Sequence, residues 1–346
     1  MYDYSIIIED LLCWYDKNAR ILPWRSNPNP YYVWVSEIML QQTRVEAVKG
    51  YFERFISSLP TVEALANAKE EQLLKLWEGL GYYNRVRNMQ QAAQTIMQEY
   101  GGAIPNTYEE LLKLKGIGSY TAGAIASIAY GKKVPAVDGN VLRVMKRLEG
   151  SYEDILKASV KKKLETELLK IMPERAGAFN QAIMDLGATI CIPNGKPFCE
   201  KCPVQAYCIA RKKNIVMELP VKAKKKARRV EEKTMLLIEY QGKYALQKRA
   251  KKGLLAGLWE LPNVEGKHTK KEIQNLLEEG KKKVTIEELG SSKHIFSHVE
   301  WEMVGYHIIL TEPIEQENYV WATLEELKEE YAVPTAFSAY LPSCNS

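Results

Sequence analysis

Residues 114–147 constrain the fold of this chain more than any other segment, and they read LKGIGSYTAGAIASIAYGKKVPAVDGNVLRVMKR. The pattern predicts a tight turn at Gly116 and Gly118, a helix of small residues, and a further helix that begins after Asp138. Backbone N–H groups in such a turn, next to a helix start, suit a sequence-independent contact with one phosphate. A phosphate contact and a carboxylate at fixed separation predict an enzyme that works on nucleic acid. A plain turn and a helix N-cap at Asp138 would leave the same pattern.

The length and composition predict two globular domains. A chain of 346 residues, 46% of them hydrophobic, is too long for one ordinary core. We expect a cytoplasmic protein, because there is no secretory signal and no apolar run long enough to cross a bilayer. The formal net charge of +5 permits a polyanionic partner. All four histidines follow residue 267, so acid–base chemistry before that point must use carboxylates, tyrosine or lysine.

A lone carboxylate, Glu37, interrupts the apolar segment 31–40, which reads YYVWVSEIML. A charged carboxylate in apolar surroundings is costly, so burial would raise the pKa of Glu37 and make it a proton donor near neutrality. The alternative is a glutamate on the one solvated face of the helix. Leu40 and Gln42, at the predicted helix end, suit a wedge and a filler for a base stack.

Two loops with aromatic and basic residues are candidate nucleic-acid contacts. One contains Leu22-Pro23-Trp24-Arg25, and the other, residues 79–87, reads GLGYYNRVR. Such a loop can insert the ring of Tyr82 between bases while Arg85 meets a phosphate. The alternatives are a packing anchor at Trp24 and a turn followed by core tyrosines.

Four cysteines fall within a short segment, with the spacing Cys191-x7-Cys199-x2-Cys202-x5-Cys208. In a chain without an export signal, this clustering predicts a metal site rather than disulfides. One loop that supplies all four thiolates, with a single Cys-x2-Cys pair, suits a [4Fe–4S] cluster better than zinc. Spacing alone leaves zinc open.

The sequence pattern changes from helical to alternating near residue 222. Residues 222–229, KAKKKARR, predict a basic interdomain linker. The alternating part predicts a hairpin of 234–240 and 244–248 around Gln241-Gly242, a helix at 270–279, alternating segments at 294–310, a strand at 318–322 and a helix at 323–331. We therefore expect an all-α domain over residues 1–221 and an α+β domain over residues 230–346.

The motifs occur together, and in the same order, in one known family. The turn and the Val-Asp-Gly-Asn segment resemble the helix-hairpin-helix DNA glycosylases. Their combination with LPWR, VSEIMLQQT, EGLGYY, the four cysteines and FSH at 296–298 resembles the adenine DNA glycosylases of the MutY family. These enzymes remove adenine mispaired with 8-oxoguanine. The joint order is specific and covers nearly the whole chain.

Residues 253–262, GLLAGLWELP, resemble a loop of the NUDIX family. The helix expected to follow lacks the Arg-Glu pair of that family's pyrophosphatase box. We therefore expect a NUDIX-like recognition domain at 230–346, without hydrolase activity.

The resemblance implies a base excision repair enzyme that hydrolyses the N-glycosidic bond of adenine. It implies Glu37 as the general acid that protonates N7 of the flipped adenine. Asp138, kept ionised by the helix N-terminus, would stabilise or trap the oxocarbenium ion, so the two carboxylates should have opposite pKa shifts. Tyr120 and Asn140 would orient Asp138 and the sugar. Bifunctional relatives have a nucleophilic lysine where this chain has Tyr120, so strand cleavage should be absent or slight.

The resemblance also implies a cofactor and a set of DNA contacts. The cofactor is a [4Fe–4S] cluster on the loop 191–208, although the family's first cysteine gap is usually six residues and here it is seven. We expect a monomer in the bacterial cytosol or nucleoid that binds double-stranded DNA with an A:8-oxoguanine mispair. Phe296 would wedge the stack, and Ser297 and His298 would read 8-oxoguanine. The other expected DNA contacts are Arg20, Trp24, Arg25, Leu40, Gln42, Tyr82, Arg85, Gly116, Gly118 and Gln181.

Two other functions stay open on the sequence alone. A bifunctional glycosylase similar to endonuclease III would share the turn and the cluster, but Tyr120 and the C-terminal domain favour the first interpretation. A DNA-binding iron–sulfur protein that only scans or signals would tolerate Glu37→Gln. The enzyme should lose base excision through that change and keep its affinity for the duplex.

Overall fold

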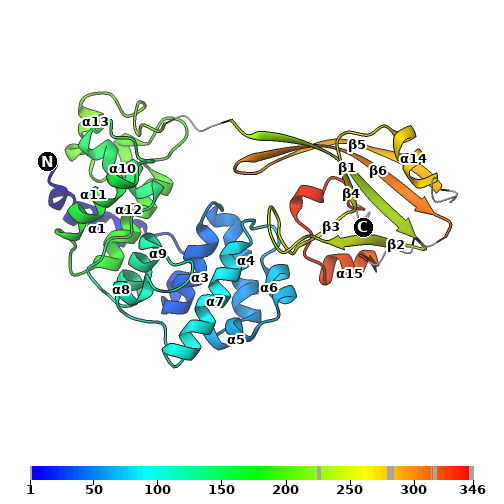
Figure 1. Cartoon of the computed structure of the whole chain (residues 1–346). Coiled ribbons are helices and arrows are strands. Elements are labelled where there is room, and N and C mark those ends of the chain that lie inside the picture. Colours follow the sequence, from blue (N-terminus) through cyan, green and yellow to red (C-terminus); the bar gives the residue numbers. More distant parts are fainter. Residues whose placement is uncertain (1, 224–226, 279–283, 313, 315–317, 343–346) are drawn as a thin grey trace. The chain divides into compact units, whose positions relative to one another are not determined.

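The computed structural model describes residues 2–223, 227–278, 284–312, 314 and 318–342 (Figure 1). The chain divides into two compact units. The first comprises Met1–Ala68 and Arg87–Lys224, and the second comprises Lys69–Val86 and Lys225–Ser346. The predicted basic linker, 222–229, falls at this division, and residues 224–226 within it lie outside the described residues.

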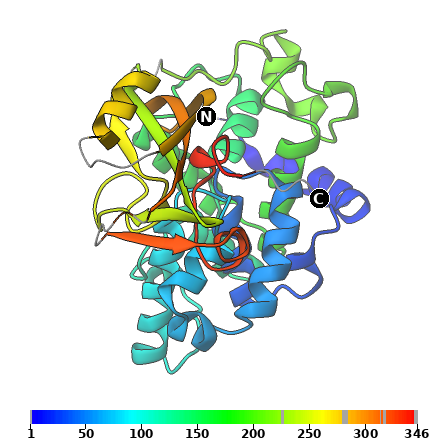
Figure 2. The same cartoon turned by 90° about the vertical axis from the view of Figure 1, so that its right-hand side faces the viewer.

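The first unit consists of helices joined by loops (Figures 1 and 2). Short 3-10 turns lie at Tyr4–Ile7, Cys199–Lys201 and Gln205–Tyr207, and a π-helical turn lies at Ile125–Ala129. The α-helices with residues in this unit are α1 (Ile8–Asn18), α2 (Pro23–Ser26), α3 (Pro30–Leu40), α4 (Val45–Ser58), α5 (Val62–Asn67), α7 (Asn84–Glu99), α8 (Tyr108–Leu111), α9 (Ser119–Ala124), α10 (Gly139–Glu149), α11 (Ala158–Leu169), α12 (Ala176–Thr189) and α13 (Ile209–Lys212).

A hydrophobic core of this unit joins α1, α10, α11 and α12 through fully buried side chains such as Leu11, Met145, Leu164 and Phe179. Small residues let the elements beside this core approach closely. A Cβ atom on Gly177 in α12 would lie 2.7 Å from the carbonyl oxygen of Ser127 in the π-helical turn. The run of small residues in the sequence is therefore explained by backbone packing.

The second unit contains a seven-stranded mixed sheet. Its strands are β1 (Arg229–Tyr240), β2 (Lys243–Lys248), β3 (Trp259–Glu260), β4 (Asn263–Glu265), β5 (Val284–Ile295), β6 (Val299–Leu310) and β7 (Tyr319–Ala322). The main order is β3-β2-β1-β6-β5, while β4 pairs with β1 and β7 pairs with β2. Strands β1 and β6 run parallel in the middle, and the other pairs are antiparallel.

Both faces of the sheet are covered by apolar side chains. Leu327 of α15 (Leu324–Glu329) belongs to the core on one face, together with Trp301 and Phe337. Ile273 of α14 (Lys270–Glu278) belongs to the core on the other face. A 3-10 turn at Thr335–Phe337 follows α15.

The predicted elements of this half are confirmed, and the structure adds the short strands β3 and β4 and most of β5. The hairpin forms at Gln241 and Gly242, which both have positive φ, and the two helices begin within a residue of their predicted starts. The alternating segments at 294–310 are the end of β5, a turn at residues 296–298 and β6. The rest of β5 was not predicted, because its residues are mostly exposed and give no apolar alternation.

Residues 69–86, which include α6 (Glu70–Leu76), belong to the second unit although they lie far from it in sequence. The Lys75 ammonium donates to the carbonyl of Tyr331 at 3.0 Å, and the Glu78 carboxylate accepts the Val333 N–H at 2.8 Å. The predicted domain limits stay a prediction, and this segment is where the division of the structure departs from them. None of the described helices is both long and apolar enough to cross a membrane.

Candidate active site and cysteine pocket

The turn predicted to hold a phosphate lies directly before α9. Gly116 has a φ of 79°, and a Cβ atom there would lie 2.7 Å from Cβ of Asn88, so glycine is required. Gly118 is the N-cap of α9, in extended conformation, with open space around its Cβ position. Conformation thus explains Gly116, and a phosphate contact at the two glycines stays a prediction.

Asp138 is the N-cap of α10. Its Oδ1 accepts the backbone N–H groups of Asn140 at 2.9 Å and Val141 at 2.8 Å, and its Oδ2 accepts the Asn140 side-chain amide at 2.9 Å. Burial raises the pKa of Asp138, and these hydrogen bonds and the charge of Arg143 oppose that rise. The expected opposite pKa shifts of the two carboxylates are therefore wrong, because burial outweighs the helix N-terminus at Asp138.

Glu37 lies in the middle of α3 and is only 5% exposed, so the solvated-face alternative is excluded. Burial raises the pKa of Glu37 to about 7; a hydrogen bond from Tyr120 lowers it, and the charge of Asp138 raises it. The Tyr120 hydroxyl donates to Glu37 Oε2 at 2.5 Å. Tyr120 was expected to orient Asp138, whereas its hydroxyl is bound to the other carboxylate.

A residue that sequence reasoning missed, Asn180, fixes the turn that leads to Asp138. Asn180 is 2% exposed in α12, and its Oδ1 accepts the Ala136 N–H at 3.1 Å. Its Nδ2 donates to the Val134 carbonyl at 2.9 Å and to Ser127 Oγ at 2.8 Å. The available signal was an uncharged amide in an apolar helix, which must find partners when buried.

Two arginines predicted to contact DNA are ion-paired inside the first unit. Arg20 and Arg25 both bind the carboxylate of Asp185, which is fully buried in α12. Trp24, between them in sequence, is 4% exposed and packs edge-on against Phe52, as its packing alternative predicted. Contacts of these three residues with DNA stay predictions, because in the structure the two arginines bind Asp185 and Trp24 packs on Phe52.

Three further predicted contacts lie in the first unit, two of them at the end of α3 and one in α12. Leu40 is the half-buried last residue of α3, and Gln42 is exposed just beyond it with a φ of 66°. Gln181 donates to the Gly177 carbonyl within α12 at 3.3 Å. Their roles toward DNA stay predictions.

The second unit brings Tyr82 to the turn at residues 296–298. Tyr82 is 55% exposed, and its hydroxyl lies 2.8 Å from Ser297 Oγ. Arg85 donates to the Leu80 carbonyl at 2.9 Å and the Gly81 carbonyl at 3.1 Å, and burial lowers its pKa to about 10. Arg85 therefore shapes the loop that presents Tyr82, and its predicted phosphate contact stays a prediction.

Phe296 and His298 occupy the same turn, between β5 and β6. The Phe296 ring packs against Trp301 with a centroid distance of 4.9 Å and against His294 at 4.7 Å. His298 is exposed. The predicted wedge is thus half-buried on the sheet core, and the predicted reader residues Ser297 and His298 are open to solvent.

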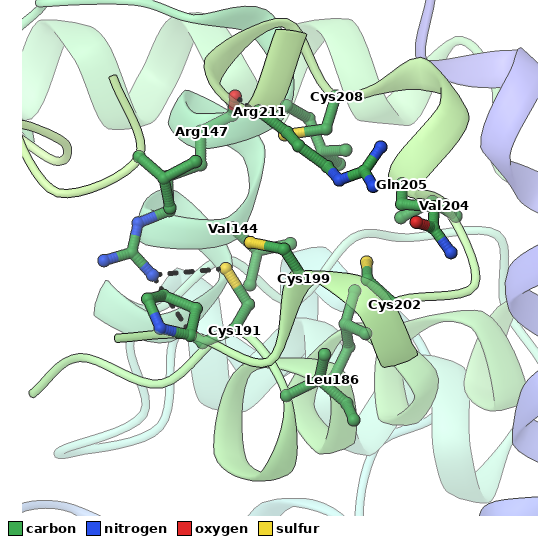
Figure 3. A pocket seen from close by; sticks show the side chains of 14 residues that line it. Val144, Arg147, Leu186, Cys191, Cys199, Cys202, Val204, Gln205, Cys208 and Arg211 are labelled. Carbon is green, nitrogen blue, oxygen red and sulfur yellow. Dashed lines mark hydrogen bonds between the residues drawn. The ribbon is translucent and has the colours of Figure 1, made fainter. Parts of the chain in front are cut away.

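The four predicted metal ligands line one pocket (Figure 3). Cys191, Cys199, Cys202 and Cys208 are free thiols, and the walls between them are formed by residues such as Val144, Leu186, Val204, Arg147 and Arg211. Among the described residues, no three or more His, Cys, Asp or Glu side chains are arranged to hold a single ion. Four thiols that line one pocket can hold either zinc or a [4Fe–4S] cluster, so the predicted cluster stays a prediction.

Helix α10 connects Asp138 to this pocket. Arg143 donates to Asn140 Oδ1 at 2.9 Å, to the Cys191 carbonyl at 2.9 Å and to the Gly187 carbonyl at 2.8 Å. One turn further on, Arg147 Nη1 lies 3.3 Å from Cys191 Sγ, which is drawn in Figure 3. Both arginines were missed because a Lys/Arg-containing helix looks solvated, although each is only 4% exposed.

Comparison with known proteins identifies the family. Residues 35–173 match the HhH-GPD superfamily of base excision DNA repair proteins, and residues 234–343 match the NUDIX domain. The adenine DNA glycosylase of Rattus norvegicus is 34% identical over 96% of this chain and 77% of its own length. That of Buchnera aphidicola subsp. Schizaphis graminum is 36% identical over 86% of this chain and 85% of its own length. The chain belongs to the adenine DNA glycosylase family.

Solved structures share the helical part of this adenine DNA glycosylase. A thermostable thymine-DNA glycosylase is 28% identical with a TM-score of 0.54, over 60% of this chain and 96% of that one. An endonuclease III in a non-covalent DNA complex is 26% identical with a TM-score of 0.52, over 61% of this chain and 95% of that one. The predicted fold class is confirmed: a helix-hairpin-helix glycosylase domain followed by a strand-rich NUDIX-like domain.

Proposed function

We propose that this adenine DNA glycosylase acts on adenine paired with 8-oxoguanine or guanine in duplex DNA, and that it is monofunctional. Glu37 is the general acid and Asp138 stabilises or traps the oxocarbenium ion. The observation that carries the proposal is the buried Glu37 carboxyl, whose pKa is raised to about 7 and whose proton is therefore available near neutral pH.

The reaction follows from this assignment. The Glu37 proton passes to N7 of the flipped adenine, and the bond between C1′ and N9 breaks with its electron pair leaving on the base. Asp138 faces the cationic sugar, and water then adds to C1′ and releases one proton, which restores the protonated acid. Asn140, bound to Asp138 by two hydrogen bonds, holds that carboxylate in one rotamer.

Tyr120 supports the monofunctional part of the proposal. A bifunctional glycosylase needs an amine at this position to form a Schiff base, and a phenol cannot supply one. The Tyr120 hydroxyl is moreover bound to Glu37, and burial raises its pKa, so it stays protonated.

The experiment is a single-turnover incubation with a duplex that carries A opposite 8-oxoguanine, analysed with and without hot alkali. A strand break only after alkali supports a monofunctional adenine glycosylase. A break without alkali would overturn the monofunctional assignment and favour the endonuclease III-like alternative. Glu37→Gln should abolish excision while keeping duplex affinity, and retained excision in that variant would remove Glu37 as the acid.

The second unit is proposed to read 8-oxoguanine through Tyr82, Phe296, Ser297 and His298. Its support is the direct contact between Tyr82, in the loop before α7, and Ser297 of the predicted reader turn. We also propose that this NUDIX-like domain has no pyrophosphatase activity, because α14 lacks the Arg-Glu pair of that site.

The cysteine pocket is proposed to bind a [4Fe–4S] cluster through Cys191, Cys199, Cys202 and Cys208. Burial raises the pKa of Cys202 to about 12, so without a metal its thiol stays neutral inside the pocket. Positive side chains at Arg147 and Arg211 suit the negative charge of a thiolate-bound cluster. The cluster would clamp the loop 191–208, and iron and sulfide analysis of purified protein tests it.

A further inference from the structure

The buried carboxylate of Asp185 pairs with two arginines, Arg20 and Arg25. Asp185 is fully buried and accepts the Arg20 N–H at 3.0 Å and Arg20 Nε at 2.7 Å. It also accepts Arg25 Nη1 at 2.8 Å and Nη2 at 2.9 Å. One carboxylate thus holds two guanidiniums that come from the segment after α1 and from α2.

The two guanidiniums also act on the candidate general acid. Helix α2 packs against α3, which carries Glu37. The charges of Arg25 and Arg20 both favour the ionised form of Glu37, against burial. The other groups that face Glu37 are the Tyr120 hydroxyl, which also favours the anion, and Asp138, whose charge opposes it.

The charge balance shows whether the arginines are compensated by Asp185 or by Glu37. Two guanidiniums and Asp185 together carry one net positive charge that acts on Glu37, and loss of the Asp185 charge would leave two. Burial opposes ionisation of Asp185, but the hydrogen bonds and charges of Arg25 and Arg20 outweigh it and lower the pKa of Asp185. Asp185 is therefore the ionised partner of the two arginines, and Glu37 keeps its raised pKa.

We propose that Asp185 is a positioning residue of the base-excision reaction, which holds Arg20 and Arg25 as one charge-compensated group so that neither forms an ion pair with Glu37. This inference rests on the proposed role of Glu37. It assigns the arginines of the Leu-Pro-Trp-Arg region a function inside the protein, in addition to any contact with DNA. If the ion pair served folding alone, loss of Asp185 would lower stability and would leave the pH dependence of excision unchanged.

The test is the pH profile of the single-turnover excision rate for Asp185→Asn. An uncompensated cation within about 4–6 Å lowers a carboxyl pKa by about 1–3 units. We expect the basic limb of the profile to move to lower pH by about one unit, which is about a tenfold loss of rate on that limb. The double variant Asp185→Asn/Arg25→Gln, which restores the charge balance, should move the limb back.

Controls separate this effect from misfolding. Asp16→Asn removes the carboxylate from an exposed pair with Arg175 and should leave the profile unchanged. If Asp185→Asn does not fold, Arg20→Gln tests the inference by removing a cation instead of the anion. Arg20 is partly exposed and Arg25 still pairs with Asp185, so this variant should fold. Loss of that cation should move the basic limb to higher pH.

The outcomes distinguish the inference from the proposed function. A rate that falls equally at all pH values in Asp185→Asn, or an unmoved limb in Arg20→Gln, overturns the inference alone. Retained excision in Glu37→Gln overturns the proposed role of Glu37, and the inference with it.

Discussion

Removal of the Tyr120 hydroxyl tests the electrostatics of Glu37 most directly. The hydroxyl donates to Glu37 Oε2 at 2.5 Å, and this hydrogen bond lowers a pKa that burial has raised to about 7. A hydrogen bond to a charged group contributes about 1.5–3 kcal/mol, and one pKa unit corresponds to about 1.4 kcal/mol. Tyr120→Phe should therefore raise the pKa of Glu37 by about 1–2 units.

The sign of the effect on activity follows from the role of the acid. Glu37 must be protonated to act, so activity is lost as pH rises through its pKa. In Tyr120→Phe the basic limb of the single-turnover rate should move to higher pH by about 1–2 units, while the plateau falls because a weaker acid transfers its proton less readily. The assay is excision of A opposite 8-oxoguanine between about pH 5.5 and pH 9.5.

The matched control is Tyr31→Phe, which removes a tyrosine hydroxyl from α3, the helix that carries Glu37. The Tyr31 hydroxyl is buried and donates to the Leu59 carbonyl at 2.7 Å, so its removal costs stability without changing the partner of Glu37. An unmoved limb in Tyr120→Phe, or the same movement in both variants, would refute the reasoning.

Three further predictions concern stability, recognition and the cysteine loop. Glu37→Gln should stabilise the fold at pH 8 by about 3 kcal/mol, because the cost of charging Glu37 appears only as pH rises from 4.5 through about 7. Urea unfolding measures the free energy of unfolding at pH 5 and pH 8, and an equal gain at both would contradict this. Tyr82→Phe should reduce the preference for A:8-oxoguanine over A:G about fivefold by removing its bond to Ser297, measured as a ratio of rates under subsaturating enzyme. Arg143→Gln should lower thermal stability and iron retention together, because Arg143 donates a hydrogen bond to the Cys191 carbonyl. Calorimetry and an iron assay measure the two, and an unchanged value in either one would contradict the prediction.

Local sequence pattern was enough to predict the environment of Glu37. One carboxylate in an apolar helix can be buried or solvated, and the adjoining motif favoured burial, which the structure confirms. The fold class and the family were likewise predictable, because an ordered series of motifs over nearly the whole chain is more specific than any one of them. The conformation of Gly116 follows from the same local reasoning.

The pairing of side chains was not predictable, because it depends on contacts across long sequence separations. Tyr120 and Glu37 are 83 residues apart, and Arg25 and Asp185 are 160 residues apart. Composition and periodicity say which groups are buried, and they do not say which partner satisfies each one. The same limit applies to residues 69–86, whose polar contacts with residues 331–333 have no local signature.

Helix α10 links the cysteine loop to the Asp138 carboxylate. Its first turn is held by Asp138, which caps it, and Arg143 and Arg147 on its next turns bind the backbone of residues 187–192. A rigid helix transmits a displacement of its far end to its cap, because its length and hydrogen bonds are fixed. A group that holds residues 191–208 in place therefore also holds the Asp138 carboxylate, so the pocket would serve catalysis by fixing geometry at the sugar.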